Sequence, residues 1–120
     1  MSAMVDDRAF RERLMLIFWR EAGGHLTVLQ HFAELSPPIA LATRQDAFEA
    51  AFRAVHSLRG AARAVNEGDV EMLCLGIETS LSRGLHGEQE WLAAVHDDVR
   101  AAIGKLASAC AALRPGGRDG

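Results

Sequence analysis

Residues 48–81 read FEAAFRAVHSLRGAARAVNEGDVEMLCLGIETSL, and this stretch decides the fold. On both sides of Asn66-Glu67-Gly68, apolar residues recur every three or four positions, as they do along the buried face of an α-helix. Asn66 tolerates the left-handed backbone conformation that closes many helices, and the glycine favours a turn. The stretch therefore predicts two amphipathic helices, over about 44–65 and 69–83, which run antiparallel on either side of a tight turn.

Clusters of glycine and proline delimit the rest of the chain. They lie at Ser36-Pro37-Pro38, at 84–87 and at Pro115-Gly116-Gly117. The segments between them are rich in Ala, Leu, Arg and Glu, which favour helix, and none alternates apolar and polar residues as a strand does. Two further helices are predicted, over about 6–35 and 88–113, the second beginning with Glu88 and Glu90.

Short connections between the predicted helices make sequence neighbours pack antiparallel. The expected fold is all-α, an antiparallel up-down four-helix bundle that occupies residues 1–114. Residues 115–120 have nothing to bury, and we expect them to form a flexible tail or linker.

The composition excludes several classes of protein. The chain has 120 residues, of which 49% are hydrophobic, enough for one domain with its own core. Its net charge of −3 argues against nucleic-acid binding, and no run of about 18 apolar residues is available to span a membrane. Cys74 and Cys110 make no disulfide framework, and the N-terminus lacks the pattern of a secretory signal. We expect a cytoplasmic protein.

The first predicted helix carries two apolar stripes. One consists of Phe10, Leu14, Ile17, Val28, Phe32 and Leu35, and the other of Met15, Trp19 and Leu26. Two interpretations remain open: the helix buries a broad face in the bundle, or part of this surface stays exposed and docks a partner.

His56 and Glu78 are candidates for a functional pair. His56 lies eleven residues before Glu67 and Glu78 lies eleven residues after it, so in an antiparallel hairpin the two side chains stand at the same height. Each directly follows a core position, Val55 or Ile77, and so lies at the edge of its apolar stripe. A carboxylate that binds one imidazole nitrogen fixes the tautomer and leaves the other nitrogen free to react.

The helical face around His56 suits an anion. Arg59 and Arg63 follow His56 by about one and two turns, and two guanidinium groups beside an imidazole can hold a phosphoryl group. Gly60 costs helix stability relative to alanine, which close approach of another molecule would explain. Ala61 continues this small-residue surface.

These residues carry a family resemblance. The segment His56-Ser57-Leu58-Arg59-Gly60 resembles the H-x-L-K-G motif of histidine-containing phosphotransfer (HPt) domains, with arginine in place of the usual lysine. Phe18-Trp19-Arg20-Glu21-Ala22 is similar to the opening helix of the phosphotransfer (P1) domain of the chemotaxis kinase CheA. Glu78-Thr79-Ser80-Leu81 also follows the family pattern, and Asn66 replaces a glycine that is usual at the end of the second helix. The resemblance covers about residues 10–113.

The resemblance implies a phosphocarrier with a defined site. His56 would be the phospho-acceptor, assisted by Glu78 and Arg59. The partner-binding surface would consist of Gly60, Arg63, Ala61 and Phe52. A glutamate at position 78 is typical of chemotaxis-kinase P1 domains and points to the CheA type. The implied partners are the catalytic domain of a histidine kinase, which supplies the phosphoryl group, and a response-regulator receiver domain, whose aspartate takes it.

The chain lacks the motifs of other chemistries. It has no glycine loop of the kind that cradles ATP phosphates, so a kinase reaction would need a separate ATP-binding domain. His25 and His31 fall on different helix faces and no C-x-x-C pair is present, so neither a metal nor a cofactor is expected. The alternative function is a helical adaptor that is not phosphorylated and binds partners through Met15, Trp19 and Leu26.

Overall fold

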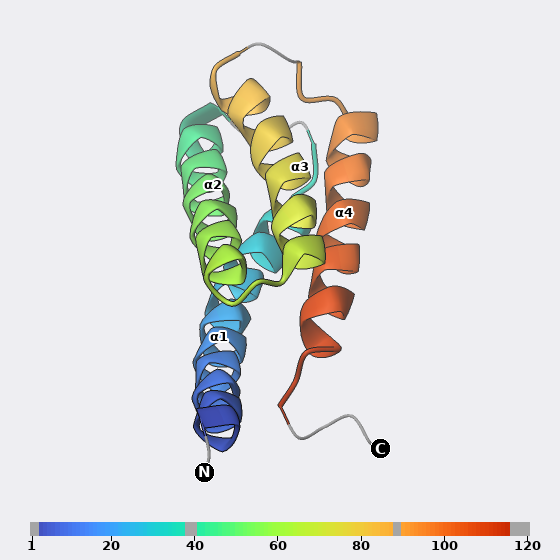
Figure 1. The fold of residues 1–120 in the computed structure, drawn as a ribbon. Helices are drawn as coiled ribbons and strands as arrows, with labels where there is room; N and C mark the ends of the chain where they lie inside the picture. The colour runs from blue at the N-terminus through green and yellow to red at the C-terminus, as the bar shows by residue number, and fades with distance from the viewer. Residues whose placement is uncertain (1–2, 38–40, 88–89, 116–120) are drawn as a thin grey trace.

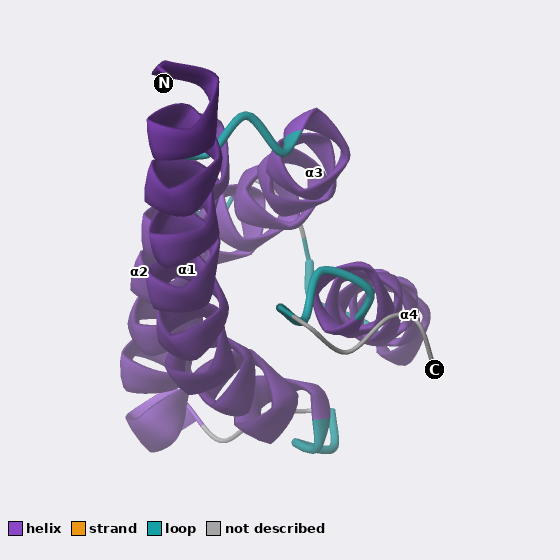
Figure 2. Cartoon of the chain, turned by 60° about the horizontal axis from the view of Figure 1, so that its bottom comes forward, coloured by secondary structure: helices purple, strands orange, loops and turns teal. Residues whose placement is uncertain are grey.

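The computed structural model describes residues 3–37, 41–87 and 90–115, and within them the chain is helical, without any strand. Its elements are α1 (Ala3–Ala33), α2 (Leu41–Ala64), α3 (Gly68–Leu85) and α4 (Ala93–Ala111). Successive helices run in opposite directions, which confirms the predicted antiparallel four-helix bundle (Figure 1). Seen from below, α1 and α2 lie on one side of the bundle, with α3 and α4 on the other (Figure 2).

The α2–α3 hairpin forms as the sequence predicts. Asn66 adopts the left-handed conformation, with φ of 60°, and the amide of Glu67 donates a 2.9 Å hydrogen bond to the carbonyl of Ala62. These contacts close α2 and reverse the chain directly into α3. No side chain caps the start of α3, so the turn itself sets the register of the two helices.

The core is a continuous apolar cluster to which every helix contributes. Its largest fully buried apolar side chains are Phe18 and Leu29 of α1, Phe48, Val55 and Leu58 of α2, Val70, Ile77 and Leu81 of α3, and Ile103 and Leu106 of α4. None of the helices in the described part of the chain is long and apolar enough to cross a membrane.

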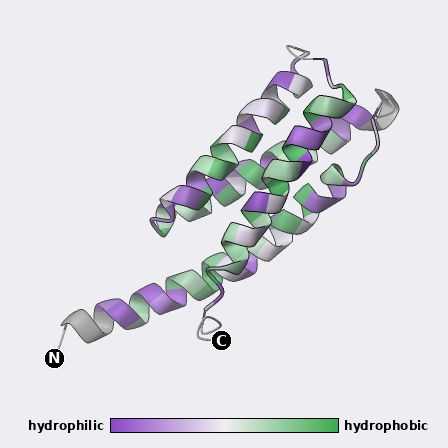
Figure 3. Cartoon of the chain, turned by 90° about the vertical axis from the view of Figure 1, so that its right-hand side faces the viewer, coloured by the Kyte–Doolittle hydropathy of each residue, from purple (hydrophilic) through white to green (hydrophobic). Residues whose placement is uncertain are grey.

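Helix α1 buries only part of the predicted stripe, in which Phe32 lies in the core as expected. Phe18 and Leu29 are buried, whereas Phe10 and Ile17 are exposed. The N-terminal turns of α1 extend beyond the other helices (Figure 3), so side chains there are less covered than those in the middle of the bundle. Phe18 and Leu29 each directly follow a predicted position, so the placement of α2 and α4 decides which of the two neighbouring side chains is buried.

Helix α4 begins later than predicted. Residues 90–92 are not helical and the helix starts at Ala93, while Glu88 lies outside the described residues. Trp91 is buried in this connection, with its ring edge-on to Phe48 at 4.7 Å between centroids. Packing of this one large ring at the end of the core outweighs the helix propensity of the residues around it.

His96 ties α4 to the end of α1. It is completely buried, accepts a 3.0 Å hydrogen bond from the indole Nε1 of Trp91, and donates from its own Nε2 to the carbonyl oxygen of Ala33 at 3.1 Å. The guanidinium of Arg100 donates to the same carbonyl at 3.0 Å. A carbonyl at the C-terminal end of a helix has no partner within that helix, and these two side chains supply one.

Candidate functional site

His56 and Glu78 meet across the α2–α3 hairpin. The Nδ1 atom of His56 lies 2.8 Å from Oε2 of Glu78. The His56 side chain is 58% exposed, whereas that of Glu78 is only 12% exposed. The contact that equal spacing about the turn predicts is therefore present, with the imidazole at the surface and the carboxylate set between the helices.

The contact fixes which nitrogen of His56 is free. Burial tends to raise the pKa of Glu78, but hydrogen bonds from Arg59 and His56 offset this and hold that pKa below its usual value. Glu78 is therefore ionised at neutral pH and can only accept a hydrogen bond. Nδ1 of His56 carries the proton, and the lone pair of the neutral ring is on Nε2.

Arg59, predicted from the sequence to form part of the anion site, binds Glu78 in the structure. Its Nε donates to Oε1 of Glu78 at 2.5 Å, and a terminal nitrogen lies 3.5 Å from Oε2. The hydrogen bond and the charge of Glu78 raise the pKa of Arg59. A guanidinium can grip both carboxylate oxygens at once, which an ammonium cannot do, so the arginine in the motif holds Glu78 in a fixed orientation.

Arg63 remains the more accessible of the two cations. Its side chain is 76% exposed, and its Nε is 3.9 Å from Oε2 of Glu71, a partner that sequence reasoning missed. Glu71 lies two turns before Glu78 on α3, so the same hairpin spacing that pairs His56 with Glu78 would have predicted this pair.

Three other predicted residues surround His56. The ring of Phe52 is stacked almost parallel to the imidazole, at 9° and 6.0 Å between centroids. Gly60 is exposed, and a Cβ atom added there would meet nothing within 4 Å. Ala61 is half-buried and packs against the core, so it contributes less to the surface than predicted.

The chemistry of the described residues centres on His56. No group of His, Cys, Asp and Glu among them is arranged to hold a metal ion. Cys74 and Cys110 are both buried, and burial raises the pKa of these thiols to about 12 and about 11. Neither is therefore suited to act as a nucleophile at neutral pH.

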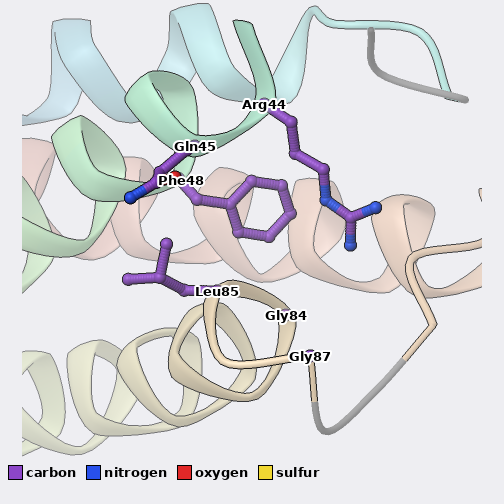
Figure 4. Close-up of a pocket in the computed structure, with 6 residues that line it drawn as sticks. All are labelled: Arg44, Gln45, Phe48, Gly84, Leu85 and Gly87. Atoms are coloured by element: carbon purple, nitrogen blue, oxygen red, sulfur yellow. The ribbon is translucent and has the colours of Figure 1, made fainter. Parts of the chain in front are cut away.

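A cavity of about 330 Å³ lies elsewhere, at the end of the bundle where α2 begins and α3 ends. The ring of Phe48 points into it, and the Arg44 guanidinium lies 5.3 Å from the centre of that ring (Figure 4). The cavity shares no residue with the His56 cluster.

The surface proposed for the adaptor alternative is partly covered. Met15 and Leu26 pack against the core. Trp19 lines a groove between α1 and α4, with the guanidinium of Arg114 5.7 Å from its ring centre. The more exposed apolar side chains of α1 are Phe10 and Ile17, on another face.

Comparison with known proteins agrees with this geometry. No curated protein and no solved structure gives a significant match. The family model described as "Hpt domain" matches residues 13–114, which include α1 from residue 13 onward, all of α2, α3 and α4, and the His56 cluster. The chain belongs to the Hpt domain family.

Proposed function

We propose that His56 is the phospho-acceptor through which this Hpt domain carries a phosphoryl group from a histidine kinase to a receiver aspartate. The observation that carries the proposal is the 2.8 Å contact of Nδ1 with Glu78, which leaves Nε2 as the free nitrogen of a side chain that is 58% exposed. No second histidine among the described residues combines exposure with a carboxylate contact on its ring.

In the first step, the lone pair of Nε2 attacks the γ-phosphorus of ATP bound to the kinase. The new N–P bond forms as the bond from phosphorus to the bridging oxygen breaks, and ADP leaves with that electron pair. The proton stays on Nδ1, so the phosphorylated ring gains positive charge, which the carboxylate of Glu78 stabilises. Arg59 holds that carboxylate in place through its Nε, which lies 2.5 Å from Oε1 of Glu78.

In the second step, a carboxylate oxygen of the receiver aspartate attacks the same phosphorus. The N–P electron pair returns to Nε2, and the neutral imidazole with its proton on Nδ1 is restored. Positioning and charge stabilisation dominate phosphoryl transfer, so a domain that presents one oriented imidazole suffices as a carrier.

We further propose a domain of the CheA type, acting in the cytoplasm as the substrate of a chemotaxis kinase. Support for the CheA type comes from the glutamate at position 78, where many relay domains have glutamine or another polar residue. A carboxylate stabilises a charged ring better than an amide does, which favours the forward reaction with ATP.

The test is phosphorylation by a histidine kinase catalytic domain in the presence of ATP. We expect acid-labile, base-stable phosphate on the wild-type protein and none on His56→Gln, because glutamine cannot form the N–P bond. Circular dichroism of His56→Gln should match that of the wild type, since the side chain lies at the surface. Labelling that persists in His56→Gln would assign the site to another residue, and the absence of labelling in the wild type would favour the adaptor function.

A further inference from the structure

Phe52 stacks against the imidazole that carries the proposed reaction. The two residues are four apart on α2, so their side chains lie on the same side of the helix, about one turn apart. Side chains of an α-helix lean towards its N-terminus, so His56 leans over the turn that carries Phe52. The two rings lie 9° from parallel with 6.0 Å between their centroids, which is the offset stack that aromatic rings favour.

The two rings differ in how firmly the protein holds them. Phe52 is half-buried and packs against the hydrophobic core, so the fold sets its position. The His56 side chain is 58% exposed and has fewer neighbours to restrain it. In this pair the phenylalanine is therefore the fixed ring, and the imidazole is the ring whose position depends on the contact.

The contact with Glu78 does not fix the whole imidazole. It holds one corner, Nδ1, at 2.8 Å from Oε2 of Glu78. A carboxylate oxygen accepts hydrogen bonds over a broad range of directions, so the ring could tilt about this corner and carry Nε2 with it. The stack with Phe52 restrains the plane of the ring. Together the two contacts fix both the tautomer of His56 and the direction of Nε2.

The stack also bears on the charge of the ring. When Nε2 is phosphorylated the proton stays on Nδ1, so the imidazole gains positive charge. The face of an aromatic ring attracts a cation that lies within about 6 Å of its centroid, and the imidazole centroid is 6.0 Å from that of Phe52. An aliphatic side chain could fill the same space, but it would not attract this charge.

We propose that Phe52 is a positioning residue for the phosphorylation of His56, and that its ring holds the plane of the imidazole and attracts the charge that develops there. The proposal rests on the proposed function and adds a residue to its chemical step. Phe52 takes no proton and no electron pair, and it acts only through His56. The resemblance implies instead a part in partner binding, which would affect only transfer between proteins.

The test removes the aromatic ring and then restores it. Phe52→Leu keeps an apolar side chain without the ring, and Phe52→Tyr keeps the ring. Val95→Ala is the control for lost packing, because Val95 is half-buried against the same core but belongs to α4, which packs against α1 and α3. All are compared with the wild type under conditions in which urea titration shows each protein to be fully folded.

The phosphoryl donor is phosphoramidate, a small molecule that needs no docking surface. The lone pair of Nε2 attacks its phosphorus, and ammonia leaves with the electron pair of the P–N bond that breaks. We expect Phe52→Leu to lower the rate constant of labelling by about three- to tenfold. Phe52→Tyr and Val95→Ala should stay within about twofold of the wild type.

The motion of the His56 ring gives a second readout that does not depend on phosphorylation. NMR relaxation of the ring CH groups yields an order parameter, which falls as the ring moves more freely. We expect a lower order parameter in Phe52→Leu and unchanged values in Phe52→Tyr and Val95→Ala. The nitrogen chemical shifts of the ring should place the proton on Nδ1 in every variant, because Glu78 sets the tautomer.

Several results would overturn the proposal. Labelling of Phe52→Leu at the wild-type rate, or an unchanged order parameter in that variant, would show that Glu78 alone holds the ring. Equal losses in Phe52→Leu and Phe52→Tyr, or in Phe52→Leu and Val95→Ala, would show that packing matters and the stack does not. If the wild type takes no phosphate from kinase or phosphoramidate, the proposed function fails by itself, and the order parameters still decide whether Phe52 holds the ring.

Discussion

Glu78 joins two side chains of α2 into one unit. It accepts from Nδ1 of His56 at 2.8 Å and from Nε of Arg59 at 2.5 Å, while remaining 12% exposed. A partly buried carboxylate that receives two hydrogen bonds from potentially cationic groups is held in one orientation. That orientation determines both the tautomer of His56 and the direction of its free nitrogen.

Replacing Glu78 tests this role. The amide in Glu78→Gln can still accept from Nδ1, but it cannot stabilise the positive charge that develops on the ring as Nε2 is phosphorylated. Hydrogen bonds to charged groups contribute about 1.5–3 kcal/mol, so we expect phosphorylation by the kinase to slow by about tenfold to a hundredfold. Onward transfer should slow less, because in that step the nitrogen is the leaving group.

The matched control is Glu71→Gln, which removes the carboxylate 3.9 Å from Arg63 and leaves the His56 contact intact. Rapid-quench measurements of both half-reactions distinguish the two variants. If Glu78→Gln is phosphorylated as fast as the wild type, the carboxylate only orients the ring and its charge takes no part.

Gly60 is a second residue whose role is specific. Nothing lies within 4 Å of a Cβ placed there, so the fold itself does not require glycine. Glutamine is a better helix former, and Gly60→Gln should raise the free energy of unfolding by about 0.5–1 kcal/mol in urea titrations. The added side chain projects beside His56, so transfer to a receiver should become slower. A stabilised variant with unchanged transfer kinetics would show that access does not explain this glycine.

At the scale of helices, the local sequence pattern predicted the α2–α3 hairpin. It did not predict features that depend on packing between segments far apart in the chain. The α2–α3 turn depends on Asn66 and on spacing, both visible in the sequence, and the His56–Glu78 contact follows from them. The start of α4 depends on Trp91, which is buried against residues far away in the chain. His96 occupies the core stripe of α4, three residues before Val99, but sequence alone does not reveal the Trp91 and Ala33 groups that satisfy its ring.

Gly84, in the last turn of α3, leaves room for the packed rings of Phe48 and Trp91. A Cβ added there would lie 2.5 Å from the ring of Phe48 and 2.6 Å from that of Trp91. Gly84→Ala should therefore lower the free energy of unfolding by about 1–3 kcal/mol, in spite of the better helix propensity of alanine.

Gly76 provides the control within the same helix. A Cβ at this position meets nothing within 4 Å, so Gly76→Ala should stabilise the protein by about 0.5–1 kcal/mol. Urea denaturation of both variants checks the opposite signs. Equal stabilisation by the two alanines would mean that the rings of Phe48 and Trp91 move aside without cost.

At the scale of the whole molecule, the two thiols in the core make the free energy of unfolding depend on pH in the alkaline range. Burial raises the pKa of Cys74 to about 12 and that of Cys110 to about 11, whereas the ordinary value is 9.0. The folded state therefore retains protons that the unfolded chain loses above pH 9, and the free energy of unfolding must fall as the pH rises. The limiting slope is about 1.4 kcal/mol per pH unit for each thiol.

The composition makes this effect measurable, because the chain has no tyrosine and its only lysine is Lys105. Few other groups titrate between pH 9 and pH 10. Urea titrations at pH 8, 9 and 10 should show a decreasing free energy of unfolding for the wild type. A variant with alanine at both cysteines should show a much flatter dependence, whatever its absolute stability. An equal slope in the two proteins would mean that the thiols ionise in the folded state as readily as in the unfolded chain, and that water reaches the interface of α3 and α4.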